Sequence, residues 1–338
     1  MQSSHFAQLK VSDESKIDGT IILQDEVIML ADTTQYMQCM EVWGGNQHVD
    51  SGVVMAGLDA WVFSRPYGNS TGGGDVYYVS SCATGRITRL LVADVSGHGD
   101  VVAGTAASLR GLMRRFVNHL DQKQFVKSMN GQFVALSDVG CFATAVVTTF
   151  FAPTNELSLC NAGHPPPLVY RASRKEWEFL DGTDKDGVNI PFGIDDIDEY
   201  GQFSVRLRVN DLVLCYTDSL VEARLKGTSD LLGKEGLLKI VQTLDPTKPE
   251  GFTASLLAAI DQQLPGSLDA DDVTVLLFRP NGLAKKAPFI TRLMAPIRLM
   301  GAIIARPFSG QPIPWPDFSL PNVGGMFLSR FEKTDRKH

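Results

Sequence analysis

Several features that would define a compartment or a reaction are missing from this 338-residue sequence. Its five cysteines are an odd number and contain no Cys-x-x-Cys pair, so buried free thiols in a reducing cytoplasm are expected. No cysteine begins a Cys-x₅-Arg loop, so a cysteine nucleophile for phosphoester cleavage is lacking. The absence of a Gly-x₄-Gly-Lys-Ser/Thr loop argues against a nucleotide kinase or ATPase.

Basic charge and long apolar runs are also scarce. The net charge of −7 argues against a nucleic-acid partner, because phosphate binding needs a basic surface. The first residues have no basic stretch followed by an apolar one, so no secretory signal is expected and the predicted location is cytoplasmic. Residues 289–308 are apolar but are interrupted by Arg292, Pro296 and Arg298. A helix packed on the domain or on a partner chain is favoured there over peripheral membrane contact.

The composition that is present, 44% hydrophobic and 20% charged residues, is typical of a globular protein with a sizeable core. Runs of strand-forming residues alternate with two pairs of helical patterns. Strands are predicted at 53–64, 75–81, 87–95, 142–152, 156–162, 166–172, 176–181, 203–209, 211–217 and 272–280, and helices at 101–120, 125–136, 234–244 and 250–264. Two helix pairs can cover two sheets, which predicts a layered α+β sandwich.

The chain divides into three predicted parts. Residues 1–52 are mixed in composition and are expected to be an N-terminal extension that packs on the domain. Residues 53–280 carry the regular strand and helix patterns and form the predicted domain. Residues 281–338 are rich in proline and glycine, end in a charged run, and are expected to form an extended appendage.

Four aspartates stand where a predicted strand meets a loop. They occur in GGGDVYYV (Asp75), LLVADVSGHG (Asp94), LCYTDSLVEA (Asp218) and DADDVTVLLF (Asp271). Alone, each has an ordinary explanation, such as a turn, a helix N-cap or a solvated acidic loop. Carboxylates gathered from distant segments repel one another unless a cation lies between them, and hard oxygen ligands favour Mg²⁺ or Mn²⁺.

In this order, the motifs resemble those of the PPM (type 2C) metal-dependent protein phosphatases, and specifically their SpoIIE-like bacterial branch. The resemblance runs from about residue 57 to residue 280 and includes GGDVYYV, VADVSGHG, NAGHPPPLVY, PFG, YTDSLVEA and DDVTVLLF. It implies an α+β fold of the four-layer αββα sandwich type with two Mn²⁺ or Mg²⁺ ions at one end of the stacked sheets.

The resemblance also implies a ligand set. Asp94 would bridge the two ions and Val95 would contribute its backbone carbonyl. Asp75, Asp218 and Asp271 would complete the site, with Asp272 as the alternative if the register is shifted by one residue. The implied reaction is hydrolysis of phosphoserine or phosphothreonine by a water that both ions activate. His98 is a candidate general acid for the leaving alkoxide, although a structural or solvent-exposed role is at least as common.

Three further residues have alternative interpretations. Ser219 replaces the glycine that usually follows the YTD aspartate, and its Cβ would either crowd the metal pocket or shift the loop. His164 is expected to be a structural hydrogen-bonding residue rather than a ligand. Glu222 is expected to hold a loop or to pair with an arginine.

The predicted function is a serine/threonine phosphoprotein phosphatase of bacterial partner-switching signalling. The resemblance implies a phosphorylated protein substrate, such as a small anti-sigma-factor antagonist, and a homodimer is one possible assembly. Two alternatives stay open: a catalytically weak or inactive phosphatase-like binding module, for which Ser219 is the main support, and a hydrolase of small phosphoesters.

Overall fold

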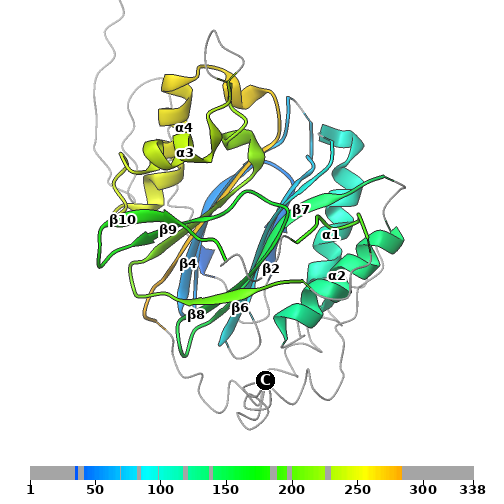
Figure 1. The fold of residues 1–338 in the computed structure, drawn as a ribbon, viewed down its shortest axis with the longest axis horizontal. Helices are drawn as coiled ribbons and strands as arrows, with labels where there is room; N and C mark the ends of the chain where they lie inside the picture. The colour runs from blue at the N-terminus through cyan, green and yellow to red at the C-terminus, as the bar shows by residue number, and fades with distance from the viewer. Residues whose placement is uncertain are drawn as a thin grey trace, which may run out of the picture. The chain divides into compact units, whose positions relative to one another are not determined.

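The strands and helices of the protein build two β-sheets stacked face to face, with helices on both outer sides (Figure 1). The structure is a computed structural model. It describes residues 35–36, 42–68, 70–81, 85–97, 99–116, 121–136, 140–182, 189–195, 200–224 and 230–283. The four-layer αββα fold predicted from the sequence is confirmed.

One sheet has six strands among the described residues, and all of its neighbouring pairs are antiparallel. In spatial order the strands are β11 (Phe203–Arg206), β8 (Glu156–Ala162), β7 (Ala143–Phe151), β6 (Ile87–Val95), β5 (Asp75–Ser81) and β2 (Val42–Gly45). The sequence explains its centre, because β5, β6 and β7 are runs of mostly buried residues and a glycine-containing segment precedes each of them.

The other sheet has seven described strands, of which only β1 and β3 pair in parallel. Its order is β1 (Gln35–Tyr36), β3 (Val49–Met55), β4 (Leu58–Arg65), β13 (Val273–Pro280), β12 (Leu212–Tyr216), β9 (Leu168–Arg171) and β10 (Glu176–Phe179). The last strand of the domain, β13, therefore lies in the middle of the sheet and pairs with both β4 and β12.

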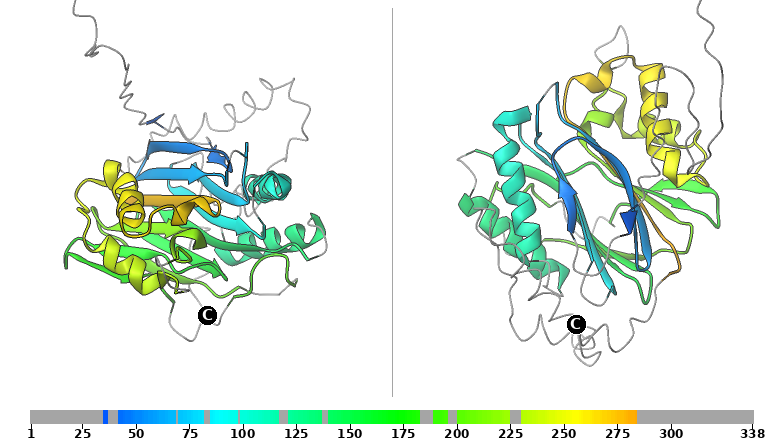
Figure 2. Two further views of the ribbon diagram at one scale, coloured as in Figure 1. Left: turned by 90° about the horizontal axis from the view of Figure 1, so that it is seen from above. Right: turned by 180° about the vertical axis from the view of Figure 1, so that it is seen from behind.

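Three hydrophobic cores separate the four layers, and Figure 2 shows the layers from two further sides. Helices α1 (Ala103–Phe116) and α2 (Gln122–Leu136) pack on the six-stranded sheet. Helices α3 (Gly233–Val241) and α4 (Phe252–Gln263) pack on the seven-stranded sheet. The third core fills the space between the sheets and contains alternate residues of their strands, such as Val92 and Val213.

The apolar run predicted as one strand at 53–64 is instead a hairpin. Met55 pairs with Leu58 across a two-residue turn, and Gly57 has φ +88°, a left-handed conformation that glycine adopts without strain. Strand β2 and the first part of β3 lie before residue 53, so part of the segment predicted as an extension supplies strands to both sheets.

The structure also shows where the domain ends on its C-terminal side. Strand β13 ends at Pro280, the residue at which the domain was predicted to end. The proposed appendage beyond residue 283, including the segment 289–308, lies outside the described residues. Among the helices that the structure describes, none has both the length and the hydrophobicity needed to cross a membrane.

Candidate active site

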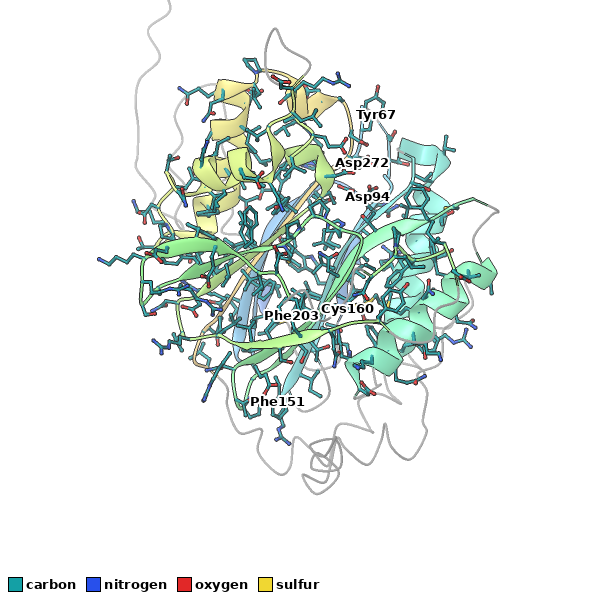
Figure 3. The ribbon with its side chains drawn as sticks, in the orientation of Figure 1. Tyr67, Asp94, Phe151, Cys160, Phe203 and Asp272 are labelled. Carbon is teal, nitrogen blue, oxygen red and sulfur yellow. The ribbon has the colours of Figure 1, made fainter. Side chains whose placement is uncertain are left out.

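The space between the sheets is apolar along most of its length and becomes polar at one end. Strand alternation places every second side chain toward the opposite sheet, and at this end the inward positions are polar. The six-stranded sheet contributes Asp75, Asp94 and Thr144, and the seven-stranded sheet contributes Ser64, Thr217 and Thr274. In Figure 3, Asp94 and Asp272 mark this end, and Phe151 lies at the opposite end.

Asp75 and Asp94 come from neighbouring strands and face each other. Asp75 is the first residue of β5 and pairs directly with Asp94 near the end of β6. The Asp75 carboxylate is buried, with only 3% of the residue exposed, and its Oδ2 accepts a hydrogen bond of 2.8 Å from the Thr217 hydroxyl. Because Thr217 directly follows β12 of the other sheet, this bond ties the two sheets together beside the acid pair.

Asp218 and Asp271 approach from the seven-stranded sheet. β12 and β13 are antiparallel, so the residues after β12 and before β13 lie at the same edge. Asp218 begins a short 3₁₀ helix just after β12 and is half-buried. Asp271 is exposed, and its Oδ1 accepts the Asp272 backbone N–H at 2.8 Å. The two acids therefore stand beside Asp75 and Asp94 at the polar end of the sandwich.

Asp272 has a different role from its neighbour Asp271. Its buried carboxylate accepts the backbone N–H of Tyr67 at 2.6 Å and that of Gly74 at 2.7 Å. Both oxygens are thus used to hold the loop that leads into Asp75. Tyr67 and Asp272 are labelled at the same end in Figure 3. This geometry favours Asp271 over Asp272 as the residue that faces a ligand.

The glycines before Asp75 allow other parts of the site to come close. A Cβ on Gly73 would lie 2.4 Å from Oδ1 of Asp272, and a Cβ on Gly74 would lie 2.7 Å from the backbone oxygen of Val95. The close approaches that the structure shows are to the Asp272 carboxylate and to the Val95 carbonyl, so the glycines pack the site itself.

The electrostatics of the cluster favour a cation. Burial, with smaller contributions from neighbouring charges, raises the pKa of Asp94 to about 8, that of Asp218 to about 6, and that of Asp75 well above its usual range. The neighbouring charges that raise the pKa of Asp94 are all carboxylates, namely Asp218, Asp271, Asp272 and Glu222. Carboxylates that destabilise one another's charge, with oxygen as their only donor atom, suit Mg²⁺ or Mn²⁺.

The acids are not gathered as tightly as in a closed metal cage. Within the described part of the chain, no three His, Cys, Asp or Glu side chains are already arranged as ligands of one ion. Two of the carboxylates are instead occupied by protein hydrogen bonds, Asp75 with Thr217 and Asp271 with a backbone amide. Mg²⁺ keeps several waters and takes only one or two carboxylates, so this open donor set fits such an ion.

The remaining candidates have separate outcomes. His98 lies outside the described residues. Ser219 is buried, and its hydroxyl is 3.4 Å from the Thr217 hydroxyl, so its Cβ fits beside the acids. Glu222 lies close enough to the acids for its charge to raise the pKa of Asp94 and of Asp218. The sequence signal that places Glu222 near the acids is its position four residues after Asp218.

Thr217 went unrecognised as a site residue, although it directly precedes Asp218.

We expect Thr217→Val to destabilise the protein by about 1–3 kcal/mol. The Thr217 hydroxyl donates to Asp75 and accepts the Thr274 N–H at 2.9 Å, and valine leaves both buried groups without this partner. Urea unfolding in EDTA measures the loss. Thr217→Ser is the matched control because it keeps the hydroxyl, and equal stabilities of the two variants would contradict the assignment.

A second pair of variants separates the roles of the adjacent aspartates. Asp272→Ala should lower the unfolding free energy by about 3 kcal/mol, because two backbone amides lose a charged acceptor. Asp271→Ala should cost less than about 1 kcal/mol, because the side chain is exposed, but should weaken Mn²⁺ binding. Urea unfolding and calorimetric Mn²⁺ titration of both variants test this. The reverse pattern would assign the ligand role to Asp272.

A four-layer αββα sandwich with acids from both sheets at one end is the architecture of the PPM-type phosphatase fold, and comparisons with known proteins agree. The protein-family model described as "Stage II sporulation protein E (SpoIIE)" matches residues 84–281, which is more than half of the chain. The chain belongs to the SpoIIE family of PPM phosphatase domains.

Solved structures show the same fold at low sequence identity. The RsbU and RsbW domains of Rv1364c from Mycobacterium tuberculosis are 21% identical, with a TM-score of 0.56; the match covers 77% of this chain and 72% of that one. The PP2C phosphatase domain with a regulatory fragment of SpoIIE from Bacillus subtilis is 16% identical, with a TM-score of 0.54 and coverages of 72% and 64%. RsbX in complex with magnesium is 12% identical, with a TM-score of 0.50 and coverages of 69% and 100%.

Proposed function

We propose that this chain is a metal-dependent phosphatase that hydrolyses phosphoserine and phosphothreonine in proteins. The observation that carries the proposal is the meeting of Asp75 and Asp94 from one sheet with Asp218 and Asp271 from the other, in a member of the SpoIIE family. Such a concentration of mutually repelling carboxylates, of which Asp75 is buried and Asp94 and Asp218 are partly buried, is unfavourable on its own and is useful where divalent cations bind.

Asp75, Asp94, the Val95 carbonyl, Asp218 and Asp271 are the proposed ligands of two Mn²⁺ or Mg²⁺ ions. When bound, such ions acidify a water and offset negative charge on a phosphoryl group. The magnesium in the RsbX structure is one reason to extend this cofactor class to the present chain. Without cations the acidic cluster would repel a phosphate group, so activity should depend strictly on added metal.

Residues around the ligands keep them in place. Thr217 orients Asp75 by a hydrogen bond from the opposite sheet, and Asp272 fixes the loop that begins at Tyr67 and ends at Asp75. His98, four residues after Asp94 in sequence, is proposed to donate a proton to the leaving serine or threonine alkoxide. That role for His98 rests on the sequence alone.

The proposal favours an active enzyme over a phosphatase-like binding module. Ser219 was the main argument for the inactive alternative. Its side chain is accommodated next to Thr217, within hydrogen-bonding distance of that hydroxyl, and the four principal acids are retained. The serine side chain therefore fills space between groups of the protein that already contact one another. This arrangement supports an active site over an inactive one.

The proposed substrate is a phosphorylated protein of a partner-switching pathway, such as a phosphoserine-containing antagonist of an anti-sigma factor. This chain is structurally similar to a chain that combines RsbU and RsbW domains, and this similarity supports the proposed substrate class. A cytoplasmic location is part of the same proposal. Comparing the phosphoproteomes of cells with and without the protein would identify the substrate itself.

The activity is tested with full-length protein and MnCl₂. We expect hydrolysis of p-nitrophenyl phosphate that EDTA abolishes, and faster hydrolysis of phosphoserine and phosphothreonine peptides than of sugar phosphates or nucleotides. Preference for the small molecules would support the small-phosphoester alternative. Binding of phosphopeptides without any metal-dependent turnover would instead support the binding module.

A further inference from the structure

His164 lies where the chain passes from one sheet to the other. It belongs to the segment between β8, in the six-stranded sheet, and β9, in the seven-stranded sheet. The residue is buried, with 5% exposure. Asn161 fixes its backbone on both sides, since the Asn161 amide donates to the His164 carbonyl and the His164 N–H donates back to Asn161 Oδ1, both at 2.8 Å.

The imidazole forms one hydrogen bond to each sheet. Its Nδ1 is 2.7 Å from the hydroxyl of Thr144 in β7, and its Nε2 is 3.0 Å from the backbone oxygen of Tyr216 in β12. A carbonyl only accepts hydrogen bonds, so Nε2 carries the proton and Nδ1 accepts the Thr144 O–H. Burial lowers the pKa of His164 to about 4, which keeps this tautomer neutral at physiological pH.

Both partners of the imidazole are next to proposed metal ligands. Thr144 is the direct cross-strand neighbour of Asp94, and Tyr216 lies two residues before Asp218. The imidazole itself touches neither acid. His164 therefore connects β7, the strand beside Asp94, to β12, the strand that delivers Asp218. It crosses between the sheets at the same end as the bond between Thr217 and Asp75.

We propose that His164 is a positioning residue that sets the spacing between the Asp75–Asp94 pair of one sheet and the Asp218–Asp271 pair of the other. This inference rests on the proposed function. A centre built from two sheets depends on how the sheets are held together, because small displacements of ligands strongly weaken metal binding and catalysis. His164 is not a proton donor in this assignment, since the protonated form is disfavoured and both ring nitrogens are in use.

The test uses full-length protein and two variants of the same position. His164→Leu removes both hydrogen bonds, whereas His164→Gln provides an amide donor and an acceptor of similar reach. We expect the leucine variant to bind Mn²⁺ at least about tenfold more weakly in calorimetric titration, and the glutamine variant to stay within about threefold of wild type. In p-nitrophenyl phosphate hydrolysis, the leucine variant should lose kcat at saturating MnCl₂ while its KM changes little.

A control variant separates positioning from a general loss of stability. Leu157→Ala removes buried side-chain volume from the core between the sheets, near the end opposite to the acids. It should lower the unfolding midpoint in urea but leave Mn²⁺ affinity unchanged. Thr144→Val breaks only the Nδ1 bond, so it gives the same test if His164→Leu does not fold, with an expected loss of about threefold or more in Mn²⁺ affinity.

The outcomes distinguish this inference from the proposed function. Wild-type Mn²⁺ affinity in folded His164→Leu and in Thr144→Val would overturn the positioning role, even if the wild-type protein is an active phosphatase. Weakened Mn²⁺ binding in both variants would support the role, even if the wild-type protein hydrolyses no phosphoester. Equal weakening in Leu157→Ala would also overturn it, because the effect would then follow stability alone.

Discussion

Asp94→Asn is expected to reduce Mn²⁺-dependent hydrolysis of p-nitrophenyl phosphate by about a thousandfold or more, with the fold intact. Asp94 is the central acid of the cluster. It is the cross-strand neighbour of Asp75, and the charges of Asp218 and Asp271 raise its pKa. Asparagine has nearly the same shape but carries no charge, so the variant removes the proposed bridging ligand without leaving a cavity. Retained activity would refute the bridging role.

The same substitution should not destabilise the metal-free protein. Burial and neighbouring acids raise the pKa of Asp94 to about 8, which means that its charge is unfavourable in the folded state. A neutral amide removes that repulsion, so the unfolding midpoint in EDTA should be equal to or higher than that of wild type. Glu176→Gln, the same type of change at an exposed residue of the edge strand β10, is the matched control and should leave activity unchanged.

The second large effect is a loss of stability of the metal-free protein as the pH rises. An unfolded aspartate has a pKa near 3.9, whereas Asp94 in the fold has a pKa of about 8. Between these values the folded state binds more protons than the unfolded state, so the unfolding free energy falls with increasing pH. The elevated pKa of Asp75 acts in the same direction.

Buried His164 works in the opposite direction at lower pH. Its folded pKa of about 4 lies below the ordinary value of 6.5, so it adds stability as the pH rises through that range. The window from pH 6.5 to 8 is therefore the one in which Asp94 dominates. We expect a loss of about 1 kcal/mol there, after allowing for solvent screening, and a fall in Tm of roughly 2–4 °C.

Thermal unfolding in EDTA across this window measures the effect. Asp94→Asn should flatten the dependence, because the titrating group is gone. Added MnCl₂ should also oppose it, because the cation binds the deprotonated acids and binding to the folded state alone raises stability. A Tm of the metal-free wild type that rises from pH 6.5 to 8 would contradict the electrostatic account of the cluster.

Much of the fold was predictable because its signals are local. Strands β5, β6 and β8 have the bounds that the sequence predicted, since buried or alternating runs there end at clear turn residues. The hairpin of β3 and β4 was missed for a local reason as well. Its two-residue turn, Ala56–Gly57, is embedded in an apolar run, and only the positive φ of Gly57 reveals it.

The contacts around the acids were predictable only in part. Each acid stood at a strand end in the sequence, but the bonds that organise them join residues that are distant along the chain. Thr217 contacts Asp75 across 142 positions, and His164 contacts Tyr216 across 52. Periodicity and turn signals contain no information on such pairs. The distinct roles of Asp271 and Asp272 likewise depend on which carboxylate the loop amides reach.

The central place of β13 affects how the protein is made. This strand is inserted between β4 and β12, which flank it on either side. While a ribosome is still synthesising residues 273–280, the nascent polypeptide exposes two open strand edges that have no partner yet. The sheet therefore closes only after synthesis of the domain is nearly finished, and Asp271 arrives together with the closing strand. Newly made chains that stop before this point would be targets for chaperones and prone to aggregate.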